Sequence, residues 1–197
     1  MLVQVKKTEV EQAITAAARA LFKTHGYAGT KIPQIAKAAG MSAANIYVYF
    51  DGKADILLSV YDAWFANQLE ALKARIDQCA SSELALRTLF VAMWQELPAA
   101  DNGFCSVLIE ALSDRSIQDK YSPRLRNTIE ASLKRLLTQC LPAASTATHQ
   151  TVTTLLIMAF DGYALNFHLK NGQTARDEDI DTLCRLFLSC DDASPKK

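Results

Sequence analysis

The chain has 197 residues, half of them apolar, and its 21 basic residues balance 21 acidic ones. This apolar content excludes a disordered chain, and the small numbers of Gly (7) and Pro (5) favour helices over sheets. Apolar runs do not exceed six residues, as in Leu155–Phe160, and no apolar segment follows Lys6 and Lys7, so we expect a cytoplasmic protein without a transmembrane span or signal peptide.

Glycine marks the ends of the first two predicted helices. Apolar residues at helical spacing predict a helix over 10–25, which Gly26 caps at its C-terminus. The same spacing predicts a shorter helix over 32–39, where Pro33 falls in the first turn and costs little. This second helix stops at Gly40.

A third short helix begins after Ser42, whose hydroxyl can cap the helix N-terminus. Ile46 and Phe50 are its inward residues, which leaves the opposite face free. A break at Asp51 and Gly52 separates it from a long helix. The helices predicted from there on span 53–79, 82–97, 103–113, 116–140, 146–171 and 175–190. We expect an all-α protein of about nine helices, with a DNA-binding domain over 1–52 and a regulatory and dimerisation domain over 53–197.

The second and third helices form a candidate helix-turn-helix. Gly40 can adopt the left-handed conformation that the turn needs, and Ala36 and Ala39 are small where the helices must cross. The free face of the third helix carries short or hydrogen-bonding side chains suited to a DNA groove: Ala43, Ala44, Asn45, Tyr47 and Tyr49. Residues 1–53 hold seven basic and three acidic residues, which favours a polyanionic partner at this end.

In continuous register, residues 26–57 resemble the TetR family of bacterial regulators. The residues that carry the resemblance are Gly26, Tyr27, Thr30, Ile35, Ala36, Ala39, Gly40, Ser42, Ile46, Tyr47, Tyr49, Phe50, Lys53, Asp55 and Leu57. Lys31 departs from the family pattern, where Ser or Thr is common, and so does Ala54, where Glu is common. The remainder resembles the family only in length and helix layout, with a lean toward BetI-like members over Glu110–Leu137.

The resemblance implies which residues contact DNA. Base edges would meet Ala43, Ala44 and Asn45, since Asn can bond adenine and Ala can pack on a thymine methyl, although both alanines are also good helix formers. Phosphates would meet Thr30, Lys31, Tyr47 and Tyr49, and Lys53 would add a positive charge at the start of the next helix. The predicted surface consists of Thr30, Lys31, Ser42, Ala43, Ala44, Asn45, Tyr47, Tyr49 and Lys53.

The resemblance also implies an effector cavity between the middle helices. The aromatic and polar residues that could line it are Trp64, Trp94, Phe104, Glu110, Tyr121, Asp161, Asn166 and His168. The two tryptophans and Phe104 can equally be core residues, and Asp161 and His168 can equally pair on the surface or across a dimer. Because the three His and five Cys lack metal-site spacing, we expect no metal and no cofactor.

Two C-terminal helices of each subunit would form a dimer interface, as in the family. The helix over 146–171 is apolar on more than one side, which indicates burial on more than one side. The expected interface residues are Leu155, Phe160, Gly162, Tyr163, Phe167, Leu183 and Phe187.

Together these features predict a homodimeric transcriptional regulator, a repressor that a small-molecule effector releases from a palindromic operator. The alternative is an architectural or assembly protein on the same fold that binds DNA and acts through a protein partner. An enzyme is disfavoured, because no nucleophile elbow, phosphate-binding loop or dinucleotide fingerprint occurs.

Overall fold

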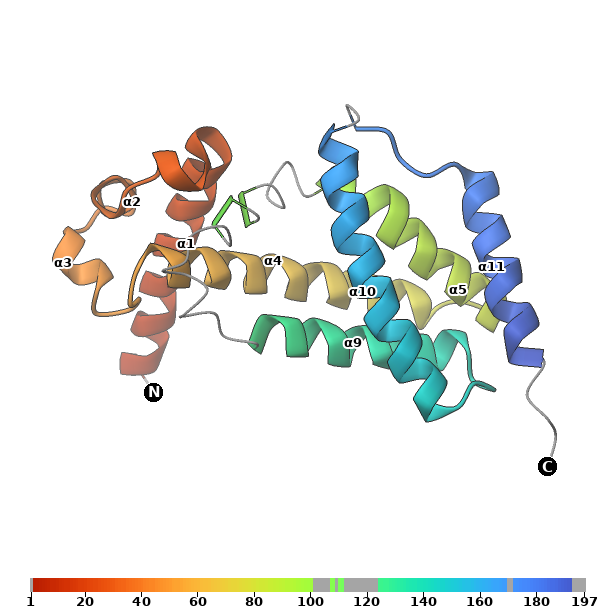
Figure 1. The fold of residues 1–197 in the computed structure, drawn as a ribbon. Helices are drawn as coiled ribbons and strands as arrows, with labels where there is room; N and C mark the ends of the chain where they lie inside the picture. The colour runs from red at the N-terminus through yellow and green to blue at the C-terminus, as the bar shows by residue number, and fades with distance from the viewer. Residues whose placement is uncertain (1, 101–106, 109, 112–123, 170–171, 193–197) are drawn as a thin grey trace. The chain divides into compact units, whose positions relative to one another are not determined.

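The computed structural model describes residues 2–100, 107–108, 110–111, 124–169 and 172–192. Every regular element in these ranges is a helix (Figure 1), which confirms the all-α prediction. None of the helices in this part of the chain combines the length and the apolar character that a membrane span requires.

The chain divides into two compact units. The first, here called the head, comprises Met1–Trp64 with Gly103–Leu125, and the second, the body, comprises Phe65–Asn102 with Arg126–Lys197. Helix α4, Lys53–Ile76, contributes its first half to the head and its second half to the body. The head also takes in a segment that follows the body's first helices along the chain, which the predicted boundary between residues 52 and 53 does not include.

Positive φ angles at two glycines shape the head. Helix α1, Leu2–Gly29, is interrupted at Gly26, whose φ of 68° and ψ of −177° leave helical geometry, but helical backbone resumes up to Gly29 instead of ending at the predicted C-cap. Helix α2 covers Ile32–Ala38, and Gly40, with φ 72°, turns the chain toward α3, Ala43–Ile46. The two short helices pack against each other, as a helix-turn-helix requires.

The head's core is formed by the inward faces that the apolar spacing predicted. Ile46 is fully buried and Phe50 is nearly so, while the rings of Phe22 and Tyr27 stack at 5.9 Å between centroids. Helix α3 is only four residues long, and Ile46 is its single buried residue. Because so short a helix has little stability of its own, packing of this side chain holds α3 in place.

The body consists of longer helices around one apolar cluster. They are α5 (Ser82–Val91), the π-helical segment η1 (Ala92–Glu96), α6 (Leu97–Ala100), α9 (Arg124–Cys140), α10 (Thr146–Leu169) and α11 (Asp177–Asp192). Helices α5 and α11 pack against each other, and η1 and α6 contact α10. Leu86, Leu89, Phe90, Leu137 and Ile180 are completely buried in this cluster.

Pro98 does not end a helix, which corrects the predicted end of the helix over 82–97 just before it. It lies inside α6, and the widened turn of η1 precedes it, with the Leu97 N–H bonded to the Ala92 carbonyl. A proline leaves the carbonyl four residues earlier without its helical donor. Here that carbonyl belongs to Trp94, and it accepts the Ala175 N–H at 3.2 Å. A partner from the segment before α11 therefore compensates for the proline.

Candidate functional site

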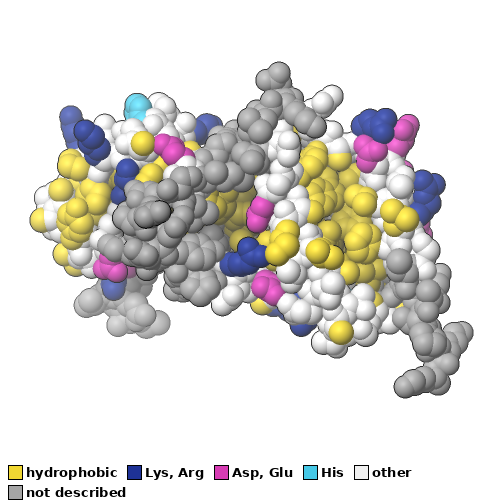
Figure 2. Space-filling model, viewed as in Figure 1, with side chains coloured by type: hydrophobic (Ala, Val, Ile, Leu, Met, Phe, Trp, Pro, Cys, Tyr) yellow, Lys and Arg dark blue, Asp and Glu magenta, His cyan; other side chains and the backbone are white. Residues whose placement is uncertain are grey.

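An exposed surface forms on α3 and the turn that follows it. Ala44, Asn45, Tyr47 and Val48 are all exposed, the last two by 59% and 71%, beside the buried Ile46. Figure 2 shows hydrophobic side chains gathered over α3, with Lys or Arg side chains next to them. Apolar and hydrogen-bonding groups on a short helix beside basic residues suit the edges of bases and the adjoining phosphates.

Sequence reasoning did not select Val48. The prediction assumed a continuous helix from Ser42 to Phe50, and nothing in such a helix distinguishes Val48 from its neighbours Tyr47 and Tyr49. The helix instead ends at Ile46, and the chain continues as a turn that exposes Val48 and half-buries Tyr49. The short length of α3 was the missing information.

The start of each short helix is capped by a polar side chain. Ser42 accepts the Asn45 N–H at 3.3 Å, which confirms its predicted role as N-cap of α3. Lys31 precedes α2, and its N–H donates to the side-chain oxygen of Gln34 at 2.7 Å. Gln34 thus makes the bond by which the third helical residue of a capping box accepts the N-cap N–H. The Lys31 side chain is exposed beside this cap.

Two of the predicted phosphate contacts are corrected by the structure. Thr30 is completely buried, and its hydroxyl donates to the Gly26 carbonyl at 2.8 Å. The Lys53 ammonium donates to the carbonyls of Tyr27 and Thr30 at 2.7 and 3.0 Å and lies 4.0 Å above the Tyr27 ring. Both side chains stabilise the turn between α1 and α2 instead of projecting from the surface.

Glu110 also lies in the head, which corrects its predicted place in an effector cavity. Its carboxylate accepts the N–H groups of Tyr27 and Ala28 at 2.9 and 3.0 Å. These contacts join residues more than 80 positions apart in the sequence, the separations being 83 and 82. No local pattern could have predicted them.

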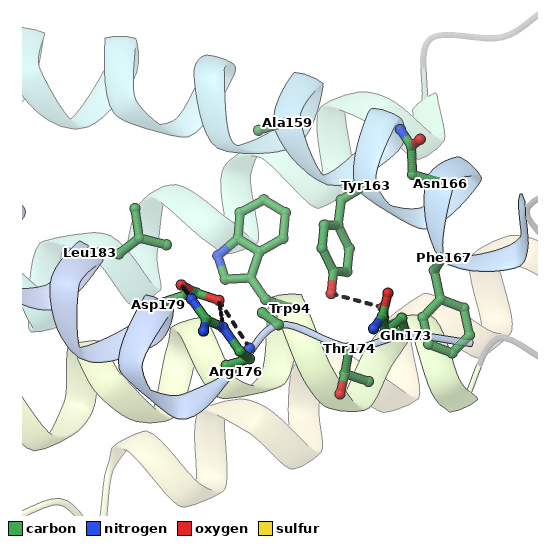
Figure 3. A pocket seen from close by; sticks show the side chains of 11 residues that line it. Trp94, Ala159, Tyr163, Asn166, Phe167, Gln173, Thr174, Arg176, Asp179 and Leu183 are labelled. Atoms are coloured by element: carbon green, nitrogen blue, oxygen red, sulfur yellow. Dashed lines mark hydrogen bonds and ion pairs between the residues drawn. The ribbon is translucent and has the colours of Figure 1, made fainter. Parts of the chain in front are cut away.

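One pocket in the body lies between α10 and the N-terminal end of α11 (Figure 3). It has a volume of about 690 Å³, and Trp94, Tyr163, Asn166, Phe167 and Leu183 line it. The rings of Trp94 and Tyr163 meet edge to face at 5.1 Å. Two of the predicted cavity residues, Trp94 and Asn166, and three of the predicted interface residues therefore share one surface pocket.

Polar groups line part of this pocket. Arg176 forms a bidentate ion pair with Asp179, at 2.8 and 3.0 Å, and the Tyr163 hydroxyl donates to the Gln173 carbonyl at 3.5 Å. Burial raises the pKa of Tyr163 above its ordinary value. Among the described residues, the Trp94 indole N–H is the buried side-chain donor that has no hydrogen-bond partner.

A second pocket is a narrow apolar cavity of about 60 Å³ in the body. Its walls come from α4, α5, η1, α6, α9 and α10, and include Phe65, Met93, Leu133 and Phe160. Asp161 is the single polar residue in its lining. Partial burial raises the pKa of the Asp161 carboxyl, against the opposing positive charge of Arg126, although the side chain also reaches the surface.

The other predicted cavity residues do not join these two pockets in the described structure. Trp64 is buried in the head, where its ring meets Tyr61 edge to face at 6.2 Å. Phe104, Tyr121 and the side chain of His168 lie outside the described residues.

The predicted interface residues divide into exposed and inward groups. Leu155 is 59% exposed on α10, near the similarly exposed Met158, and Leu186 is 58% exposed on α11. Figure 2 shows the hydrophobic surface over α10 and the space between α10 and α11. Phe187 instead packs on Phe90 at 5.3 Å between centroids. Phe160 contacts Phe65 and Trp94, so both phenylalanines belong to their own subunit's core. Gly162 is exposed, with open space where a side chain would be.

Known proteins are similar to this chain in the sequence of the head and in the fold of both units. The family model "Bacterial regulatory proteins, tetR family" matches residues 14–60. The fatty acid metabolism regulator protein of Bacillus subtilis is 28% identical over 132 residues, which cover 67% of this chain and 64% of that protein. The regulator RutR of Escherichia coli is 28% identical over 131 residues, which cover 64% of this chain and 56% of RutR. The matches thus span less than two thirds of either relative.

The crystal structure of the regulator FadR from Bacillus subtilis, in complex with stearoyl-CoA, is similar over 94% of this chain and 99% of that one. The TM-score is 0.62 at 20% sequence identity, so this likeness concerns the fold. It extends over both units, whereas the family model covers only part of the head. Over residues 14–60 the head therefore has the sequence of the TetR family of bacterial regulatory proteins, and about two thirds of the chain is similar to bacterial regulators.

Proposed function

We propose that this protein is a homodimeric DNA-binding transcriptional regulator, a repressor whose release from its operator is controlled by a small apolar effector. The observation that carries the DNA-binding part is the exposed surface of α3, where Ala44, Asn45, Tyr47 and Val48 surround a buried anchor. In the major groove, Asn45 would bond a base edge, Val48 would pack on a thymine methyl, and the Tyr47 hydroxyl would donate to phosphate.

The first experiment is selection of random double-stranded DNA on the purified protein, followed by titration of the selected site at several salt concentrations. We expect a palindromic site whose affinity falls steeply with salt. Tyr47→Phe removes only the hydroxyl and should weaken binding of all sequences alike, whereas Asn45→Ala should relax the preference at one base position. Failure of the protein to enrich any sequence would contradict a specific DNA-binding role.

The dimer would form through the exposed apolar residues of α10 and α11, since Leu155, Met158 and Leu186 stand more than half exposed on them. Two copies of one patch meeting about a twofold axis would bury these side chains and set the two heads apart for successive major grooves. Leu155→Glu and Leu186→Glu should yield monomers in analytical ultracentrifugation. Leu84→Glu is the matched control, because Leu84 is 49% exposed on α5. A wild-type protein that is monomeric at micromolar concentration would refute this part.

For the effector, we favour the narrow apolar cavity and a ligand with a long hydrocarbon chain. Its lining is apolar except for Asp161, and a relative of the same fold is known in complex with stearoyl-CoA. A volume of about 60 Å³ is too small for such a chain, so a ligand must part the helices that form the walls. Binding would then favour a conformation other than the DNA-bound one, to the extent that affinities for the two differ.

Fatty acyl-CoA compounds of increasing chain length provide the test. We expect the melting temperature to rise with chain length and the protein–operator complex to dissociate in the same order. Leu133→Phe, which fills the cavity, should abolish both effects, while Gly162→Ala should preserve them because its added methyl meets no atom within 4 Å. If acyl-CoA compounds of every length leave melting and DNA binding unchanged, this effector class is wrong.

A further inference from the structure

The backbone at the C-terminal end of α1, from its kink to the residue before Lys31, is held by charged side chains from two distant parts of the chain. Here "the turn" means Gly26–Thr30. At Gly26 the φ of 68° interrupts the helix, and a methyl group added there would lie 3.1 Å from a Glu110 carboxylate oxygen. Glycine at this position therefore serves two needs, the backbone angle and the close approach of the carboxylate.

A negative charge binds the N–H groups of the turn, and a positive charge binds its carbonyl groups. The Glu110 carboxylate accepts the N–H groups of Tyr27 and Ala28, one with each oxygen, at 2.9 and 3.0 Å. The Lys53 ammonium donates to the carbonyls of Tyr27 and Thr30 at 2.7 and 3.0 Å. Hydrogen bonds with one ionised partner are stronger than neutral ones, so the pair defines the orientation of the peptide groups of the turn.

Both charged groups stand on anchored scaffolds within the head. Residues 107, 108, 110 and 111 have helical backbone, and Val107 and Ala111 are 8% and 1% exposed. Because these neighbours are buried, they fix the backbone that carries Glu110, whose own side chain is at the surface. Lys53 begins α4, and the fully buried Ile56 follows within one turn.

The end of the turn is also the beginning of α2. Thr30 directly precedes Lys31, whose capped N–H starts the helix, and α2 packs against α3. A change in the turn therefore displaces α2, and with it the exposed residues of α3.

We infer that Glu110 and Lys53 are positioning residues for DNA binding: by holding the donors and acceptors of the turn, they place α2 and α3 in the geometry that binds the operator. This inference rests on the proposed DNA-binding function. It gives Glu110 and its buried neighbours a role in the head although they follow α3 by more than 50 residues along the chain.

Glu110→Gln separates this role from simple electrostatics. Removing a negative charge from a DNA-binding unit should raise affinity for DNA of any sequence, because repulsion of the phosphates falls. If Glu110 positions the turn, affinity for the selected operator should instead fall, by about tenfold, because an amide oxygen replaces only one of the two acceptors. The slope of affinity against salt should stay unchanged, since Glu110 contacts no phosphate.

The matched control is Glu9→Gln in the full-length chain, because Glu9 is an exposed carboxylate on α1 in the same unit. This variant should show the small gain in affinity that electrostatics predicts. Operator affinity in Glu110→Gln equal to that of Glu9→Gln, or higher than wild type, would overturn the inference.

A second measurement does not depend on DNA. In hydrogen exchange, the Tyr27 and Ala28 amides of Glu110→Gln should exchange about tenfold faster than in the wild type, while the amides of α5 and α9 in the body stay unchanged. Unchanged exchange at Tyr27 and Ala28 would also overturn the inference. If the wild type selects no DNA, the proposed function fails, but this exchange measurement still decides whether Glu110 holds the turn.

Discussion

Ile46 and Val48 are only two positions apart, but shortening Ile46 should destabilise the fold and shortening Val48 should not. Ile46 is completely buried and is the one anchor of α3, whereas Val48 is 71% exposed. Ile46→Ala leaves a cavity in the core of the head and should cost about 2 kcal/mol, the lower end of the range for such changes, because a short surface helix can partly collapse onto it. Val48→Ala should change the free energy of unfolding by less than about 0.5 kcal/mol.

Native-state hydrogen exchange on peptides from α2 and α3 measures these differences within the head. A loss of about 2 kcal/mol corresponds to roughly thirtyfold faster exchange, which we expect for Ile46→Ala and not for Val48→Ala. In the operator titration Val48→Ala should still lower affinity for DNA severalfold, because it removes a contact to the base while leaving the fold unchanged. Equal acceleration of exchange in the two variants would refute the assignment of Ile46 as anchor and Val48 as surface.

Three further outcomes follow from glycine geometry, titration and burial. Gly26→Ala should lower the unfolding free energy by about 1 kcal/mol or more, because the φ of 68° and the nearby Glu110 carboxylate disfavour a side chain at this position. Gly52→Ala is the control for thermal denaturation and should have no such effect, because an added methyl there meets only open space. The raised pKa of Asp161 stabilises the fold only at low pH, and that contribution is lost as pH rises through the folded-state pKa, so Asp161→Asn should melt slightly higher than wild type at pH 7 but not at pH 3. A lower melting temperature at pH 7 would indicate that the charged carboxylate stabilises the fold. Burial raises the pKa of Cys140 to about 12, so iodoacetamide at pH 8 should alkylate the half-buried Cys79 and spare Cys140 until the protein unfolds; modification of Cys140 in the native protein would contradict its burial.

The helical architecture could be predicted because it depends on neighbouring residues. Apolar spacing located the buried Ile46 and Phe50, and the glycines at positions 26 and 40 marked points where the backbone leaves helical angles. Ser42 caps α3 through a bond to Asn45, three residues away. Each of these features is decided within about one helical turn, which is the range over which sequence patterns carry information.

Residue roles were predicted less well where a polar side chain had several partners within reach. Thr30 and Lys53 have the chemistry to bind phosphate, and only the folded head shows them bonded to backbone carbonyls instead. Trp94 and Asn166 were grouped with Asp161 by residue type, but the fold separates them into two different pockets.

What the sequence by itself determined is the likeness of residues 14–60 to the TetR family, the all-helical class and the outward position of Ala44, Asn45 and Tyr47, because these follow from local periodicity and a continuous motif. Only the tertiary structure decided that Glu110 holds Tyr27 and that the Ala175 N–H satisfies the carbonyl Pro98 leaves free. Both are hydrogen bonds to backbone groups, which every residue possesses. Since a backbone N–H or carbonyl has no signature in the sequence, its distant partner is known only once the chain has folded.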